Sequence, residues 1–205
     1  MTGTPKKKDI KLFLGEPLTI TLLVTKVFDS LQIRYFVGGS LASSLHGIPR
    51  ATQDIDIIAE LETSHILPFI TDLQDKFYVD ADMIEEAIKR KSSFNIIHLE
   101  TMFKVDIFIS KKDKRSHEEM NRRQEYDLEA NYKLFVASPE DIILAKLYWY
   151  KLGGEISDKQ WNDIQGVFQV QKETLNISYL NDKAKEMKLL NLLFNALKEA
   201  SVDEK

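Results

Sequence analysis

The chain has 205 residues, a formal net charge of −4, and 43% hydrophobic and 29% charged residues, which is ordinary for a folded globular protein and excludes wholesale disorder. No apolar run is long enough to cross a bilayer, and the absence of cysteine excludes disulfides and thiolate metal sites. We therefore expect a cytoplasmic protein with no membrane partner and a flexible tail over residues 1–9. The negative charge argues against a protein that coats nucleic acid by electrostatics alone.

The first two thirds of the chain predict helices and strands in alternation. In chain order, the expected elements are a helix over 16–32, a strand over 33–37, a helix over 40–46, a strand over 52–59, a helix over 64–75, a short strand at 77–79, a helix over 81–91, and strands over 93–99, 103–109 and 132–136. The strands over 93–99 and 103–109 are joined by a short turn, which predicts an antiparallel hairpin.

The last third predicts helices only. Ser138 followed by Pro139 and two acids is a helix start, and Gly153-Gly154 ends that helix. Ser157 opens a second helix, and amphipathic segments continue through 197. The expected fold class is α/β (α+β), with a mixed sheet flanked by helices over 1–137 and a helical C-terminal subdomain over 138–205.

Three aspartates stand out in the predicted strands. Asp54 and Asp56 alternate with buried positions and so share one face, where two like charges about 4 Å apart cost roughly 4 kcal/mol at an effective dielectric near 20. Asp106 lies in the middle of an apolar strand, where an acid is uncommon unless it is paired or ligates something. If the two strands are neighbours, three carboxylates converge and suit Mg²⁺ or Mn²⁺ together with phosphates. In the alternative interpretation, Lys104 or Arg50 simply neutralises Asp106.

A glycine turn precedes the acids. Gly38 and Gly39 allow a ligand to approach the backbone, and the helix that begins at Ser40 points its unpaired N–H groups at whatever lies over the turn. Small residues are also what a strand-to-helix turn needs, so by itself the turn favours phosphate binding only weakly.

The run from Val37 to Ile57, VGGSLASSLHGIPRATQDIDI, resembles the signature of the DNA-polymerase-β-like nucleotidyltransferase superfamily. It looks most like the small prokaryotic members, which include the AbiEii-like toxins of toxin–antitoxin systems. The resemblance covers 33–109 well and 137–166 more loosely, where Lys146 matches a lysine that lies near the nucleotide phosphates in the family. Asp163 also matches the helical motif, but we expect it to be a helix-surface acid without a role in the site.

The resemblance implies a magnesium-dependent nucleotidyltransferase that moves a nucleoside monophosphate from an NTP, for which ATP is the expected donor, to an acceptor hydroxyl. Its catalytic and metal-binding residues would be Asp54, Asp56 and Asp106. Its nucleotide-binding residues would be Gly38, Gly39, Ser40, Arg50 and Lys146. The acceptor stays open among tRNA, a protein and a small molecule, and the toxin resemblance adds an antitoxin or a second copy as a partner. The alternative is a catalytically inactive, antitoxin-like binding protein on the same fold.

Other chemistry-bearing residues have plainer interpretations. The basic stretch over 111–123 favours a polyanionic acceptor if it lines the site, and a solvated helix face otherwise. His46 is expected to pack near a helix end. Lys146 could equally be a surface lysine that covers apolar surface with its stem. The aromatic residues of the last third predict a helix–helix core, and these are Tyr148, Trp149, Tyr150, Trp161 and Phe168.

Overall fold

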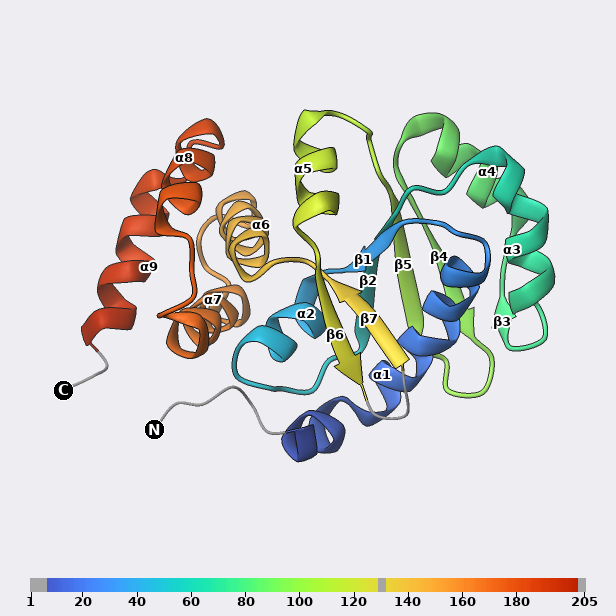
Figure 1. The fold of residues 1–205 in the computed structure, drawn as a ribbon, viewed down its shortest axis with the longest axis horizontal. Helices are drawn as coiled ribbons and strands as arrows, with labels where there is room; N and C mark the ends of the chain where they lie inside the picture. Colours follow the sequence, from blue (N-terminus) through green and yellow to red (C-terminus); the bar gives the residue numbers. More distant parts are fainter. Residues whose placement is uncertain (1–6, 129–131, 203–205) are drawn as a thin grey trace. The chain divides into compact units, whose positions relative to one another are not determined.

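A computed structural model describes residues 7–128 and 132–202 (Figure 1). The contacts of the described residues divide into two compact units. One, the sheet unit, comprises 14–41 and 51–137; the other, the helical unit, comprises 42–50 and 138–202 together with the described residues before Leu14. No helix in these described ranges is both long and apolar enough to cross a membrane.

The sheet unit is built on a mixed sheet whose seven described strands follow the order β3-β4-β5-β2-β1-β7-β6 (Figure 1). The strands are β1 (Tyr35–Val37), β2 (Asp54–Ala59), β3 (Phe77–Tyr78), β4 (Ser93–His98), β5 (Lys104–Ile109), β6 (Gln124–Leu128) and β7 (Tyr132–Val136). The pairs β2–β5 and β1–β7 are parallel, and the other neighbours are antiparallel, including the predicted β4–β5 hairpin. This is the mixed α/β architecture that the sequence predicts.

The two central strands have one buried and one half-exposed face. Every second residue of β2 and β5, from Ile55 and from Val105, is at most 4% exposed. The acids occupy the alternate positions, because successive side chains of a strand point to opposite faces. The sheet therefore keeps its apolar side for the core and presents its carboxylates on the other side.

Aromatic side chains from helices fill part of that core. Phe28 of α1 (Lys7–Ser30) stacks on Phe69 of α3 (Ile66–Leu73) with ring centroids 5.4 Å apart. Phe69 in turn meets Phe94 of β4 edge-on at 6.3 Å, and Phe28 lies 5.5 Å from Tyr35 of β1. Rings that are fully or almost fully buried in this way bind the helices to the sheet.

Three elements of this part of the chain differ from the expectation. Helix α1 begins at Lys7 rather than at 16 and includes Pro17, whose missing N–H leaves one helical bond unmade. Residues 7–9 of the expected tail belong to this helix, and 1–6 lie outside the described residues. Helix α5 (Lys114–Arg122) and strand β6 occupy a region that was predicted only as a charged stretch. The remaining helices are the 3-10 turn η1 (Thr63–His65) and α4 (Ala81–Arg90).

The helical unit contains α6 (Pro139–Leu152), α7 (Asp158–Gln171), α8 (Ile177–Glu186) and α9 (Leu190–Val202). The Ser138 hydroxyl accepts from the Asp141 N–H at 3.2 Å and the Ser157 hydroxyl from the Gln160 N–H at 3.4 Å, so both predicted caps are confirmed. Helix α2 (Gly39–His46) ends against α7, where a Cβ on Gly47 would lie 2.7 Å from backbone atoms of Gly166 and Val167. Only a glycine permits so close a contact.

Candidate active site

Strand β5 lies beside β2 in parallel register, and this register decides where the acids meet. Asp56 is the direct partner of Asp106, and Asp54 is the partner of Lys104. Paired residues of neighbouring in-register strands point to the same face, and their backbones are about 4.8 Å apart. Asp54, Asp56 and Asp106 therefore share the half-exposed side of the sheet within the length of a few residues.

A lysine already engages this group of acids. Lys104 Nζ lies 2.8 Å from Asp106 Oδ2, with 46% and 22% of the two side chains exposed. The hydrogen bond to Asp106 raises the pKa of Lys104, and the negative charges of Asp106, Asp54 and Asp56 add to this against partial desolvation. Lys104 is therefore the cation that pairs with Asp106, as one alternative interpretation expects, whereas Arg50 contacts another acid, Asp163.

The three carboxylates are the type of ligand that a divalent cation prefers, but their side chains are not gathered at coordination distance. Within residues 7–128 and 132–202, no three His, Asp or Glu side chains are gathered closely enough to hold a metal ion as they stand. The donor set of Asp54, Asp56 and Asp106 is hard oxygen, as Mg²⁺ and Mn²⁺ require, and two of the three lie directly opposite each other. The residues present therefore fit such an ion, provided that side-chain rotation closes the group and Lys104 leaves Asp106.

The glycine turn is built onto the Asp56 carboxylate. The Gly38 N–H donates to the Asp56 carbonyl at 2.9 Å, and Gly39 has φ +56°. A Cβ on Gly39 would lie 1.7 Å from Asp56 Oδ2, a distance that no side chain tolerates. The turn thus places the amides at the start of α2 against the acid, and Ser40, 9% exposed, follows directly. Backbone amides beside a potential cation site are the arrangement that phosphate binding uses.

The other predicted phosphate contacts, Arg50 and Lys146, both lie in the helical unit and both hold Asp163. Arg50 Nε donates to Asp163 Oδ1 and Arg50 Nη2 donates to Asp163 Oδ2, both at 2.6 Å. Lys146 Nζ also donates to Oδ2, at 2.7 Å. The side chains of Lys146 and Asp163 are 6% and 5% exposed. Burial acts to raise the pKa of Asp163, but the Arg50 hydrogen bond and the Lys146 charge outweigh it, and the pKa is lowered.

The expectation of a surface Asp163 is therefore wrong, and so is the alternative interpretation of Lys146 as a surface lysine. Asp163 is not a surface acid, and Lys146 is not a surface lysine; each is the buried partner of the other. The sequence did carry a signal for Asp163, because Ile164 and Val167, one and four positions on, are both fully buried and place it on the core side of α7. A contact between either cation and a nucleotide phosphate stays a prediction.

The basic stretch is largely paired with its surroundings. Lys112 contacts Glu62, Arg115 Nε donates to Glu119 at 2.7 Å, and the Arg123 guanidinium lies 4.6 Å from the centre of the Phe135 ring. These contacts favour the solvated helix face over a groove for a polyanion.

The remaining candidates are mostly structural. His46 is 1% exposed, and its carbonyl accepts from Gln171 Nε2 at 2.8 Å. The rings of Tyr150 and Trp161 lie 5.0 Å apart, and Phe168 is buried, as a helix–helix core requires. Tyr148 and Trp149 are 41% and 57% exposed, so the expectation that they belong to this core is wrong. They lie on the outward side of α6.

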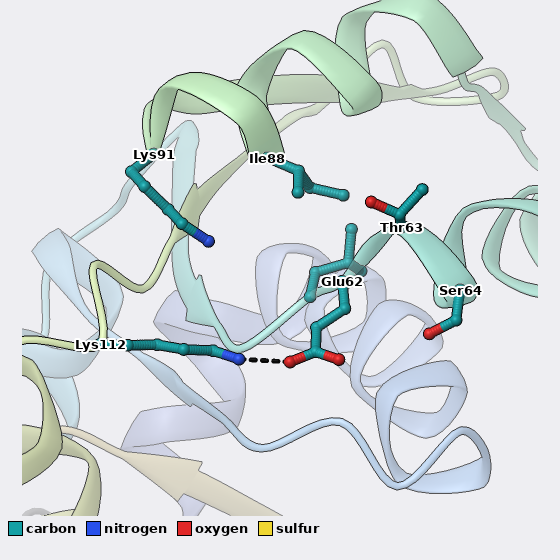
Figure 2. A pocket seen from close by; sticks show the side chains of 7 residues that line it. Glu62, Thr63, Ser64, Ile88, Lys91 and Lys112 are labelled. Carbon is teal, nitrogen blue, oxygen red and sulfur yellow. Dashed lines mark hydrogen bonds and ion pairs between the residues drawn. The ribbon is translucent and has the colours of Figure 1, made fainter.

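A pocket of about 350 Å³ lies beyond the ends of β2 and β5 at Ala59 and Ile109, away from Asp54 and Lys104. Figure 2 shows Glu62 and Lys112 pointing toward one another in this pocket. The pocket is lined by Leu61, Glu62, Thr63, Ser64, Ile88, Lys91 and Lys112. Six residues of strand, roughly 20 Å, separate it from the start of β2, and it contains none of the predicted site residues. Its Lys112 is paired with Glu62, so we place the candidate active site on the carboxylate face and not here.

No protein-family model matches the chain, and no curated protein matches it. Among solved structures, an antigenic nucleotidyltransferase-like protein from Paracoccidioides brasiliensis is similar with a TM-score of 0.52 and 16% identity, over 93% of this chain and 93% of its own. The antibiotic-resistance factor ANT(2″)-Ia is similar with a TM-score of 0.50 and 12% identity, over 91% of this chain and 96% of its own. At such identities similarity establishes the fold alone, and the chain has a nucleotidyltransferase-like fold.

Proposed function

We propose that this chain transfers a nucleoside monophosphate from an NTP to an acceptor hydroxyl. The observation that carries the proposal is the direct pairing of Asp56 with Asp106 on parallel strands, beside a glycine turn that lies against Asp56. In the reaction the acceptor oxygen bonds to the α-phosphorus, the bond to the β-phosphate oxygen breaks, pyrophosphate leaves, and the hydroxyl proton is released. ATP is the donor that we would test first.

Each part of the site has a proposed task. Asp54, Asp56 and Asp106 would hold Mg²⁺ or Mn²⁺, which supplies neutralisation of the phosphate charge that builds up during transfer. The amides of Gly39 and Ser40 receive phosphate oxygens at the start of α2. Asp106 accepts the proton of the acceptor hydroxyl as a general base.

The test is incorporation of label from α-³²P-ATP into an acceptor, with total cell lysate as the acceptor source. We expect Asp56→Asn and Asp106→Asn each to abolish incorporation, because each removes a carboxylate of the paired set. Asp127→Asn is the matched control, since Asp127 is an exposed strand acid on β6. Incorporation that survives in both site variants would refute the proposal.

One observation favours a second candidate, a catalytically inactive nucleotide-binding protein. The Lys104 ammonium is paired with Asp106, one of the three carboxylates that would hold the metal ion. Calorimetric titration with Mg-ATP, followed by an assay for released pyrophosphate, separates the two candidates. Binding without pyrophosphate release, across donors and lysates, would favour the inactive protein. A toxin–antitoxin role has only the sequence resemblance in its favour, and the acceptor is proposed only as a hydroxyl.

A further inference from the structure

The ion pair between Lys104 and Asp106 is unusual in its surroundings. Lys104 opens β5 opposite Asp54, and its ammonium reaches along the same face to Asp106, the partner of Asp56. Lys104 therefore lies among three carboxylates. Lys133 of β7 makes an ion pair of the same kind, with Glu125 at 2.6 Å, and lies opposite Asp127 on β6, but no cluster of three carboxylates surrounds it among the described strands.

Electrostatics explains why a cation is needed at this point. Without one, Asp56 and Asp106 would face each other as like charges across neighbouring strands, which destabilises a sheet. The Lys104 ammonium relieves this repulsion. Its four-carbon stem is flexible, and 46% of the side chain is exposed to solvent. Such a side chain can rotate to solvent without any movement of the backbone.

We propose that Lys104 is an internal counter-ion of the carboxylate site, which neutralises Asp106 in the ligand-free protein and is displaced when a divalent cation binds. This inference rests on the proposed function for the identity of the cation site. It has a consequence for specificity, because a free divalent ion must compete with a tethered ammonium. When the ion binds together with a nucleotide, the displaced Lys104 can pair with the negative phosphates of that nucleotide. The protein therefore selects the metal–nucleotide complex over the bare metal.

The experiment measures binding of Mn²⁺ to the full chain from the electron paramagnetic resonance of the free ion, with and without ATP. We expect Lys104→Met to tighten binding of bare Mn²⁺ on the order of tenfold, because a positive charge close to the site is removed. Lys104→Arg keeps the charge and should remain within about twofold of the unmodified chain. Lys133→Met, which breaks an ion pair of the same kind on β7, should leave the affinity unchanged.

A second readout needs no metal. In EDTA, Lys104→Met should lower the melting temperature, and the added change Asp106→Asn should recover the loss, because the unpaired carboxylate is then gone. The two readouts together separate a counter-ion from a lysine that merely packs, since a packing defect would not be recovered by neutralising Asp106.

The outcomes distinguish this inference from the proposed function. Equal Mn²⁺ affinity of Lys104→Met and the unmodified chain, with binding lost in Asp106→Asn, would overturn the counter-ion and leave the carboxylate site standing. Tighter binding in Lys133→Met as well would reduce the effect to net charge and also overturn it. No Mn²⁺ binding by any variant, with or without ATP, would remove the cation site and both proposals with it.

Discussion

The buried ion cluster of Asp163 with Arg50 and Lys146 offers the sharpest test of the structure. We predict that Asp163→Asn strongly destabilises the helical unit, although the substitution is nearly isosteric. The substitution removes the negative charge that two cations share. The Lys146 side chain, which is only 6% exposed, is then left beside an uncharged amide. An uncompensated charge of this kind is among the more costly defects in a protein interior.

The size of the effect follows from burial. Breaking a buried pair by removing one partner costs about 3–5 kcal/mol. Arg50 is 28% exposed and can turn part of its charge to solvent, so we place the cost towards the lower end of that range. For a chain of this length each kcal/mol corresponds to about 2–4 °C in melting temperature, so a cost of about 3 kcal/mol predicts a drop of roughly 6–12 °C.

The pH dependence has a defined sign. The pKa of Asp163 is lowered in the folded chain, so its contribution to stability is fully present above the ordinary aspartate value of 3.8 and is lost as the pH falls through the lower folded value. The stability difference between the unmodified chain and Asp163→Asn should therefore be constant near neutral pH. It should shrink only below about pH 4.

The assay is urea unfolding followed by far-ultraviolet circular dichroism between pH 3 and 8, with melting curves alongside. Asp158→Asn is the matched control, because Asp158 is an exposed acid in the first turn of the same helix, and we expect a cost of about 0.5 kcal/mol from the helix dipole. A melting temperature for Asp163→Asn within 2 °C of the unmodified chain at pH 7, an interval on the order of 1 kcal/mol or less, would refute the buried cluster.

Further predictions concern the acids and the glycines. Asp56→Asn and Asp106→Asn should keep the fold, by circular dichroism and melting, while nucleotide transfer is lost; unfolding of both would contradict a local role. Gly39→Ala should lower the free energy of unfolding by well over the roughly 1–2 kcal/mol that a left-handed backbone costs, because its Cβ would meet Asp56 Oδ2. Gly154→Ala, with φ +78° and nothing within 4 Å, measures that backbone cost alone, and equal losses in urea unfolding would contradict the contact. Gly47→Ala should lower the melting temperature by several degrees, on the order of 2 kcal/mol, and an unchanged melting curve would contradict the close approach to α7.

Local patterns in the sequence were sufficient for much of the fold. Alternation of acids with Ile55 and Val105 placed the carboxylates on one side of their strands, because the side-chain period of a strand is two. The caps at Ser138 and Ser157 marked where α6 and α7 begin, because a hydroxyl satisfies a free N–H within three residues. Both signals act over a few residues, and such signals can be recognised in a sequence.

Elements with weak local signals were missed. Helix α1 extends back through Pro17 to Lys7, although proline disfavours the interior of a helix. The packing of Phe28 against Phe69 offsets part of the free-energy cost of that proline. Strand β6 is short and largely polar, and its pairing with β7 rather than its composition makes it a strand.

The sequence by itself determined which residues are acidic, which face of each strand they occupy, and that a glycine turn precedes them. Only the tertiary structure decided that Asp56 stands opposite Asp106, since register between β2 and β5 is a property of two strands and not of either one. It also decided that Lys104 holds Asp106 while Arg50 reaches Asp163, 113 residues away. An ion pair forms only between charges that are close in space, and residues so distant along the chain become close only when the chain folds.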